Sequence, residues 1–242
     1  MIASDLVNRC QQRLNEDPSI TTPVYYPYAE VLSAVNRAER LFVLLTLCLE
    51  TTVTFQATGA TFYNMRSFFT DWMLPLRIST VAGQRVRPAR LVDLDALDAG
   101  WQANYGATSR YVALGFDFVA LYQQMAMPLI ITYAQAPAPM VQATDTPSIN
   151  EDYHPALIDG AIPWLRVKEG GQEFQKTMPY LKRFLAEADR EARYVRTRNL
   201  AARYDNLPYE MRRLDRSKFA GIRPDLPSAV GGRDEKPGAS SQ

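Results

Sequence analysis

Side chains that could support catalysis or bind a metal are few in this 242-residue chain. His154 is the only histidine, so every mechanism or zinc site that needs two imidazoles is excluded. Cys10 and Cys48 are the only cysteines, which excludes a disulfide framework and a metal site of four thiolates. His154 precedes Pro155 at the expected start of a helix, so a capping or packing role is the favoured interpretation.

An acidic run at residues 93–98 has the carboxylate density of a calcium-binding loop. That loop needs glycine at its sixth place and glutamate at its twelfth, whereas this chain has Asp98 and Asn104 there. We expect instead a short helix with exposed acids and with Leu94 and Leu97 facing inward. The glycine pair at 170–171 lacks the spacing and the Lys-Ser/Thr pair of a phosphate-binding loop. We therefore predict a protein that is not an enzyme and needs no cofactor or metal.

Cationic side chains gather on the last helix that the sequence predicts. They are Lys182, Arg183, Arg190, Arg193, Arg196 and Arg198. A solvated helix face, with arginine and glutamate at helical spacing, explains them without any function. The functional alternative is contact with nucleic acid or with an acidic partner.

The composition changes after Arg203, where proline and glycine become frequent and apolar residues become sparse. Four of the apolar residues alternate with basic ones in a way that suits docking into a groove of a partner. The candidate docking residues of this arm are Tyr209, Met211, Arg212, Arg213, Leu214 and Phe219. We expect the arm to be extended and to be held by a neighbouring subunit or another protein.

Helical periodicity marks the two ends of the chain before the arm, and strand patterns occupy the middle. Apolar residues recur at helical spacing over residues 2–15 and 28–49, and again after residue 151. Between them, β-branched and aromatic runs separated by glycines predict short strands, with a hairpin at Gly115. Pro163 predicts a kink or break in its helix. Pro179 indicates a bend or restart in the last helix, which we expect over residues 172–202.

We expect an α+β fold, with a helical bundle from the N- and C-terminal helices, a small central antiparallel β domain and an extended C-terminal arm. The expected parts are N-terminal helices at 1–50, a β-rich insertion at 51–135, a linker at 136–150, a C-terminal helical pair at 151–203 and the arm at 204–242. The net charge of +1 argues against a surface that neutralises phosphates throughout. The longest apolar run is shorter than the roughly 20 residues of a membrane-spanning helix, so we expect no membrane partner.

The order of several short motifs resembles the head-to-tail adaptor (connector) proteins of tailed bacteriophages. The resemblance covers about residues 1–200. The first motifs that carry it are the helix at 28–49, which contains Val35-Asn36-Arg37-Ala38, the segment 92–97 followed by Trp101, and Tyr111 with 116–121. The others are 129–133, which leads into Ala136-Pro137, and Ile149 with 153–161. Pro163 departs from the smooth helix that the family leads us to expect there, and we expect the long arm in a subgroup of the family only.

This resemblance implies a structural protein of the virion, without catalysis, assembled in the host cytoplasm. Such adaptors form a homo-oligomeric ring, commonly a dodecamer, beneath the portal protein at the head–tail junction. The ring extends the channel through which genomic DNA passes during packaging and ejection, and it gives the tail nozzle or tube protein a platform. In such a ring we expect the arm to dock on the portal. The cations of the last helix would face the channel or a neighbouring subunit.

Two other classes of protein stay open at this point. A tail-completion or tail-tube-end protein would share the ring but pair with tail proteins and not with the portal. A sequence-independent DNA-binding module would use the cationic helix and would bind free DNA strongly at low salt.

Overall fold

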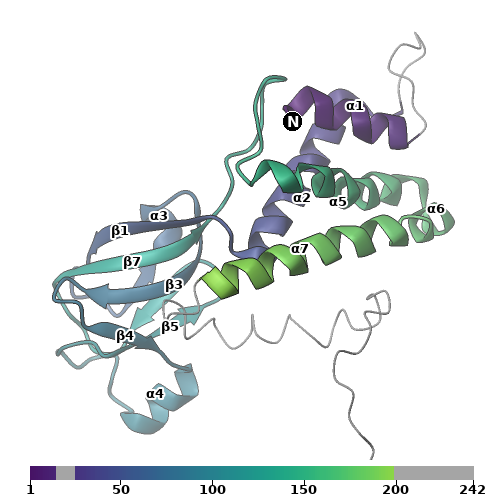
Figure 1. Cartoon of the computed structure of the whole chain (residues 1–242). Helices are drawn as coiled ribbons and strands as arrows, with labels where there is room; N and C mark the ends of the chain where they lie inside the picture. Colours follow the sequence, from purple (N-terminus) through teal and green to yellow (C-terminus); the bar gives the residue numbers. More distant parts are fainter. Residues whose placement is uncertain (15–24, 199–242) are drawn as a thin grey trace, which may run out of the picture.

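The computed structural model describes residues 1–14 and 25–198 and joins a group of packed helices to a curled mixed sheet (Figure 1). The α-helices are α1 (Ala3–Arg13), α2 (Tyr28–Thr46), α3 (Met65–Phe68), α4 (Leu91–Leu97), α5 (His154–Arg166), α6 (Gly171–Gln175) and α7 (Met178–Arg198). The strands are β1 (Glu50–Gln56), β2 (Phe62–Asn64), β3 (Trp72–Thr80), β4 (Arg85–Pro88), β5 (Arg110–Leu114), β6 (Phe118–Leu121) and β7 (Pro128–Gln135). The predicted α+β class is confirmed.

Helices α1 and α2 form because their apolar side chains recur every three to four residues. Val31, Val35, Ala38 and Phe42 make one fully buried stripe along α2. This helix ends three residues earlier than we predicted. Leu47 takes a left-handed conformation (φ 57°) and its N–H donates to the carbonyl of Val43 at 2.7 Å, which closes the helix.

Helix α5 is the centre of the bundle and packs against α1, α2 and α7. Almost all of its residues are buried, which is why a proline is tolerated inside it. The predicted break at Pro163 is wrong, since the helix runs unbroken from His154 to Arg166. Packing on three sides outweighs the one backbone hydrogen bond that the proline removes.

The C-terminal helical segment is divided in two, as Pro179 indicated. Helix α6 ends at Gln175 and α7 begins at Met178. The N–H of Tyr180 donates to the carbonyl of Thr177 at 3.0 Å, which forms the first turn of α7. Pro179 is then the second residue of α7, where a helix has no use for a backbone N–H. The sequence-predicted end of this helix, beyond Arg198, lies outside the described residues.

The seven strands form one sheet in the order β1-β7-β3-β4-β5-β6-β2. The hairpin at Gly115 is confirmed, since β5 and β6 pair antiparallel around its positive φ of 64°. The antiparallel pairing that we expected holds for every strand pair except one, since β4 and β5 pair parallel through Arg87–Arg110 and Pro88–Tyr111. The segment between them, residues 89–109, contains α4 and is long enough for the crossover that a parallel pair requires.

The apolar interior consists of three clusters of buried side chains. The largest fills the helical bundle and takes in Leu74, Leu76 and Ala134 from the adjacent strands. A second lines the inner face of the curled sheet around Trp72 and Tyr133. The third lies on the outer face, where Leu94 of α4 and Trp101 cover part of β5 and β6. Leu97 was predicted to face inward with Leu94, but 54% of it is exposed.

Candidate functional site

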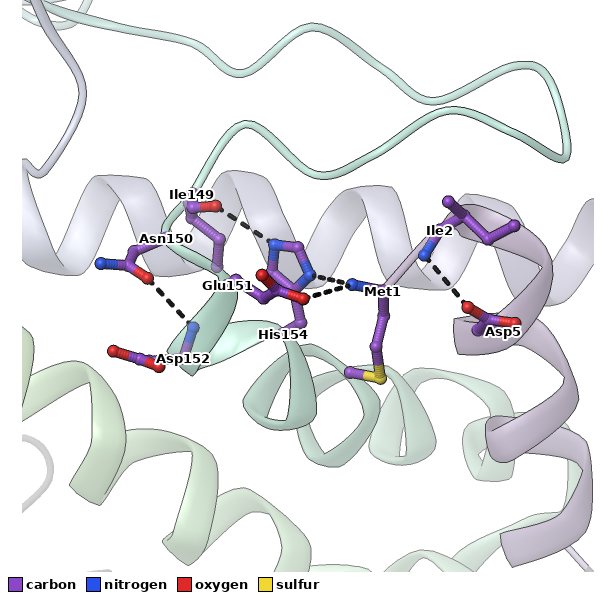
Figure 2. A network of polar contacts seen from close by, with 8 residues as sticks. All are labelled: Met1, Ile2, Asp5, Ile149, Asn150, Glu151, Asp152 and His154. Atoms are coloured by element: carbon purple, nitrogen blue, oxygen red, sulfur yellow. Dashed lines mark hydrogen bonds and ion pairs between the residues drawn. The ribbon is translucent and has the colours of Figure 1, made fainter.

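His154 is buried and belongs to a network of polar contacts between the starts of α1 and α5 (Figure 2). Its Nε2–H donates to the carbonyl of Ile149 at 3.2 Å, so Nδ1 accepts from the Met1 ammonium at 3.0 Å. Burial, together with the positive charge of Met1, lowers the pKa of His154 and keeps the ring neutral. The Met1 ammonium also lies 3.5 Å from the Glu151 carboxylate. The imidazole therefore joins the starts of two helices, which is the capping or packing role that the sequence favoured.

Arg183 holds the bundle together from α7. Its Nε donates to Oδ2 of Asp159 at 3.1 Å, and Asp159 also accepts from Arg13 of α1. The carboxylate of Asp159 is largely buried in α5, whereas the two guanidinium groups reach the surface. One aspartate thus links three helices. Arg183 has a structural partner in its own chain.

Other predicted cations of α7 pair with acids on the same helix. Arg190 lies 2.7 Å from Glu187 and its guanidinium lies 5.4 Å from the ring centre of Tyr153. Arg193 pairs with Asp189 one turn earlier. This exposed face therefore carries mixed charge. Lys182 is half-buried, and the side chains of Arg196 and Arg198 lie outside what the structure describes.

The predicted docking residues of the C-terminal arm lie outside the described residues. These are Tyr209, Met211, Arg212, Arg213, Leu214 and Phe219. The docking assignment of the arm therefore stays a prediction.

Sequence reasoning missed a group of exposed phenylalanines near the β2 end of the sheet. Phe62 of β2 and Phe118 of β6 are 44% and 46% exposed, and the register Phe62–Ala120 and Asn64–Phe118 places them on one face. Phe116 in the β5–β6 turn and Phe68 in α3 are both 54% exposed, but the ring of Phe68 packs on Phe55 of the inner cluster and not on this pair. Clustered exposed apolar side chains are typical of a protein-binding surface. The only sequence signal was the aromatic density itself, because the register that joins them is non-local.

A second exposed aromatic lies on the helical bundle. Trp164 is 49% exposed although its helix α5 is otherwise nearly all buried. The guanidinium of Arg37 of α2 lies 6.0 Å from the centre of its ring. Tryptophan and arginine are the residues most enriched at binding hot spots, so this pair is a second candidate contact surface.

Within residues 1–14 and 25–198, no three His, Cys, Asp or Glu side chains gather in a way that could hold a metal ion. None of the helices described is both long and apolar enough to cross a bilayer.

Two comparisons bear on identity. No curated protein matches the chain. The family described as SU10 adaptor protein matches residues 1–214, which takes in the helices, the sheet and the first part of the arm. A match over most of the chain, with the helix–sheet–helix order that the structure shows, establishes the relationship: the chain belongs to the SU10 adaptor protein family, a family of phage adaptor proteins of the virion.

Proposed function

We propose that this protein is a head-to-tail adaptor that forms a ring under the portal, extends the DNA channel and provides the platform for the tail. The observation that carries the proposal is the family match over residues 1–214. The described structure supports a building block and not an enzyme, because its titratable groups at α1, α5 and α7 serve to join helices.

Two separate exposed apolar surfaces support assembly into a ring. In a ring each subunit uses one patch toward the neighbour ahead and a different patch toward the neighbour behind. The phenylalanine cluster around Phe62 and Phe118 lies on the sheet, and the Trp164–Arg37 pair lies on the bundle. Both are available for contacts with a second copy, with the portal or with a tail protein. We propose twelve copies, as is common for adaptors of this kind.

The C-terminal arm is the proposed portal-docking element. The family match ends at Leu214, so it includes five of the six predicted docking residues and leaves out Phe219. We propose that Tyr209, Met211 and Leu214 fill apolar pockets of the portal and that Arg212 and Arg213 make polar contacts there.

The outer face of α7 is proposed as a channel-facing or inter-subunit surface. Its arginines alternate with Glu187 and Asp189, and DNA that must slide is served better by mixed charge than by tight phosphate contacts. Lys182, Arg190 and Arg193 are the described residues of this proposal, and Arg196 and Arg198 extend it along the sequence.

The arm is tested by deleting residues 204–242 and measuring capture of the chain on immobilised portal rings. We expect the full chain to bind and the truncated chain to lose binding while keeping its unfolding midpoint. A variant that replaces only Tyr209 and Leu214 with serine is the matched control for chain length, and it should also lose binding. Retained binding by the truncated chain contradicts the role of the arm. Capture on tail tubes but not on portal rings favours the tail-completion alternative.

A further inference from the structure

A row of arginines crosses the outer face of the sheet over three neighbouring strands. Ser79 of β3 pairs with Arg85 of β4, and the same antiparallel register, continued by two residues along each strand, sets Arg77 opposite Arg87. Arg87 in turn pairs with Arg110 of β5. Residues that pair across strands project from the same face, so the side chains of Arg77, Arg87 and Arg110 stand side by side.

The inner face of these strands shows that the row is external. Ile78, Val86 and Tyr111 are the sequence neighbours of the three arginines, and all three are buried in the cluster inside the curled sheet. Since side chains alternate between the faces of a sheet, the arginines point outward. Arg87 is exposed, and the other two are half-buried.

Although α4, which carries Asp93 and Asp95, packs on the same face over β5 and β6, the three arginines have no ion-pair partner in the part of the chain that the structure describes. None of Arg77, Arg87 and Arg110 forms an ion pair there, and β3, β4 and β5 contain no acidic residue. The Nε of Arg77 is buried and has no hydrogen-bond partner among the described residues. Like charges on adjacent strands destabilise a sheet. A face that keeps three of them in register is therefore built to meet an anion.

Hydroxyl groups extend the row on the side away from β5. Thr132 of β7 pairs with Arg77, and its Oγ1 lies 2.9 Å from Oγ1 of Thr52 on β1. Thr52 and Thr54 are exposed on this face. Arginine together with threonine hydroxyls is the usual set of donors to nucleic-acid phosphates.

We propose that this surface, made of Arg77, Arg87, Arg110, Thr52 and Thr132, binds the phosphate backbone of double-stranded DNA without reading its sequence. Strands lie about 4.8 Å apart, so the three guanidinium groups span roughly 10 Å across the outer face. The named residues of the row offer charge and hydroxyl donors and no large apolar side chain of the kind that anchors a bound protein. This places phosphate binding on the sheet. On α7 the described arginines already pair with acids, which suits a surface that lets DNA slide past without tight phosphate contacts.

The experiment is a titration of a fluorescein-labelled 30-base-pair duplex with the full chain, followed by anisotropy at several salt concentrations. Each phosphate contact contributes about −0.9 to the slope of log K against log salt. The double variant Arg87→Gln/Arg110→Gln should therefore reduce the magnitude of the slope by about 1.8 and weaken binding at 0.1 M salt on the order of 60-fold. Arg87→Lys/Arg110→Lys keeps the charge and should keep most of the slope.

The control variant is Arg190→Gln/Arg193→Gln, which removes the same charge from α7 and should leave slope and affinity unchanged. Two duplexes of unrelated sequence should bind equally. The proposal is overturned if the sheet variant, with an unchanged unfolding midpoint, binds DNA like the parent chain. It is also overturned if the α7 variant carries the loss, or if a polyglutamate peptide binds the row and DNA does not.

The inference extends the proposed function, but its test needs neither a portal nor a ring. Loss of the DNA contact with intact portal binding would remove this assignment alone. Intact DNA binding without portal binding would remove the adaptor proposal and leave this one standing.

Discussion

Replacing Gly160 with alanine tests how closely the three central helices approach one another. Gly160 lies in α5 at its contact with α2 and α7. A Cβ at this position would lie 2.7 and 2.8 Å from two ring carbons of Phe184 and 3.0 Å from Cβ of Ala38. Ordinary carbon contacts are about 3.5–4.0 Å. The helices would therefore have to separate by several tenths of an ångström, because Phe184 and Ala38 are themselves fully buried.

The expected cost follows from two opposing effects. Overpacking a well-packed core destabilises by about 1–3 kcal/mol. Alanine also favours the helix over glycine by about 1 kcal/mol. We therefore expect Gly160→Ala to lower the free energy of unfolding by up to about 2 kcal/mol, which is what remains when the gain is subtracted from the cost.

Urea unfolding followed by circular dichroism measures this difference. Gly171→Ala is the matched control, because a Cβ there meets nothing within 4 Å; it should leave stability unchanged or raise it. In a Phe184→Leu background, the cost of Gly160→Ala should shrink by at least about 1 kcal/mol, since the two sites are in contact. Equal costs of Gly160→Ala in both backgrounds would refute the close approach that this reasoning requires.

The remaining predictions concern two buried carboxylates. Asp159→Asn weakens the charged hydrogen bonds to both of its arginine partners, and we expect the free energy of unfolding in urea to fall by about 2 kcal/mol. The loss is no larger because both guanidinium groups reach the surface and can be solvated. A loss below about 0.5 kcal/mol would contradict this prediction, because it is the size expected for ion pairs on the surface of a protein. Burial of Glu39 raises its pKa although it accepts from the N–H of Ser148 at 2.5 Å. Folding therefore favours the protonated carboxyl of Glu39. The contribution of this carboxyl to the free energy of unfolding rises as pH falls from neutrality through its raised pKa, and it levels off below the ordinary pKa of glutamate. The parent chain should gain stability relative to Glu39→Gln over that pH range in parallel urea titrations, and a difference that does not change with pH would contradict the assignment.

The sequence predicted elements well where their patterns are local. The apolar stripes of α1 and α2, the Gly115 hairpin and the restart near Pro179 all depend on neighbouring residues, and the structure confirms them. The break expected at Pro163 does not occur, because tertiary packing, which no local pattern reveals, stabilises the helix around it.

Features that depend on strand register could not be predicted. The parallel pairing of β4 with β5 follows from a crossover through α4, and the alternation within either strand does not show it. The arginine row has the same origin, since Arg77, Arg87 and Arg110 are far apart in the sequence and meet only through the pairing of three strands. The cationic helix and its pairing with acids on the same helix could be predicted from local spacing, whereas the ion pair of Arg183 with Asp159 of α5 is non-local and could not.

The central claim, that this chain is an adaptor of the head–tail junction, is tested most directly by native mass spectrometry of the purified chain mixed with portal rings. The account predicts a discrete complex with one adaptor chain for each portal subunit. Portal rings that stay free at an excess of folded chain, while the chain forms rings alone or on tail tubes, would contradict it.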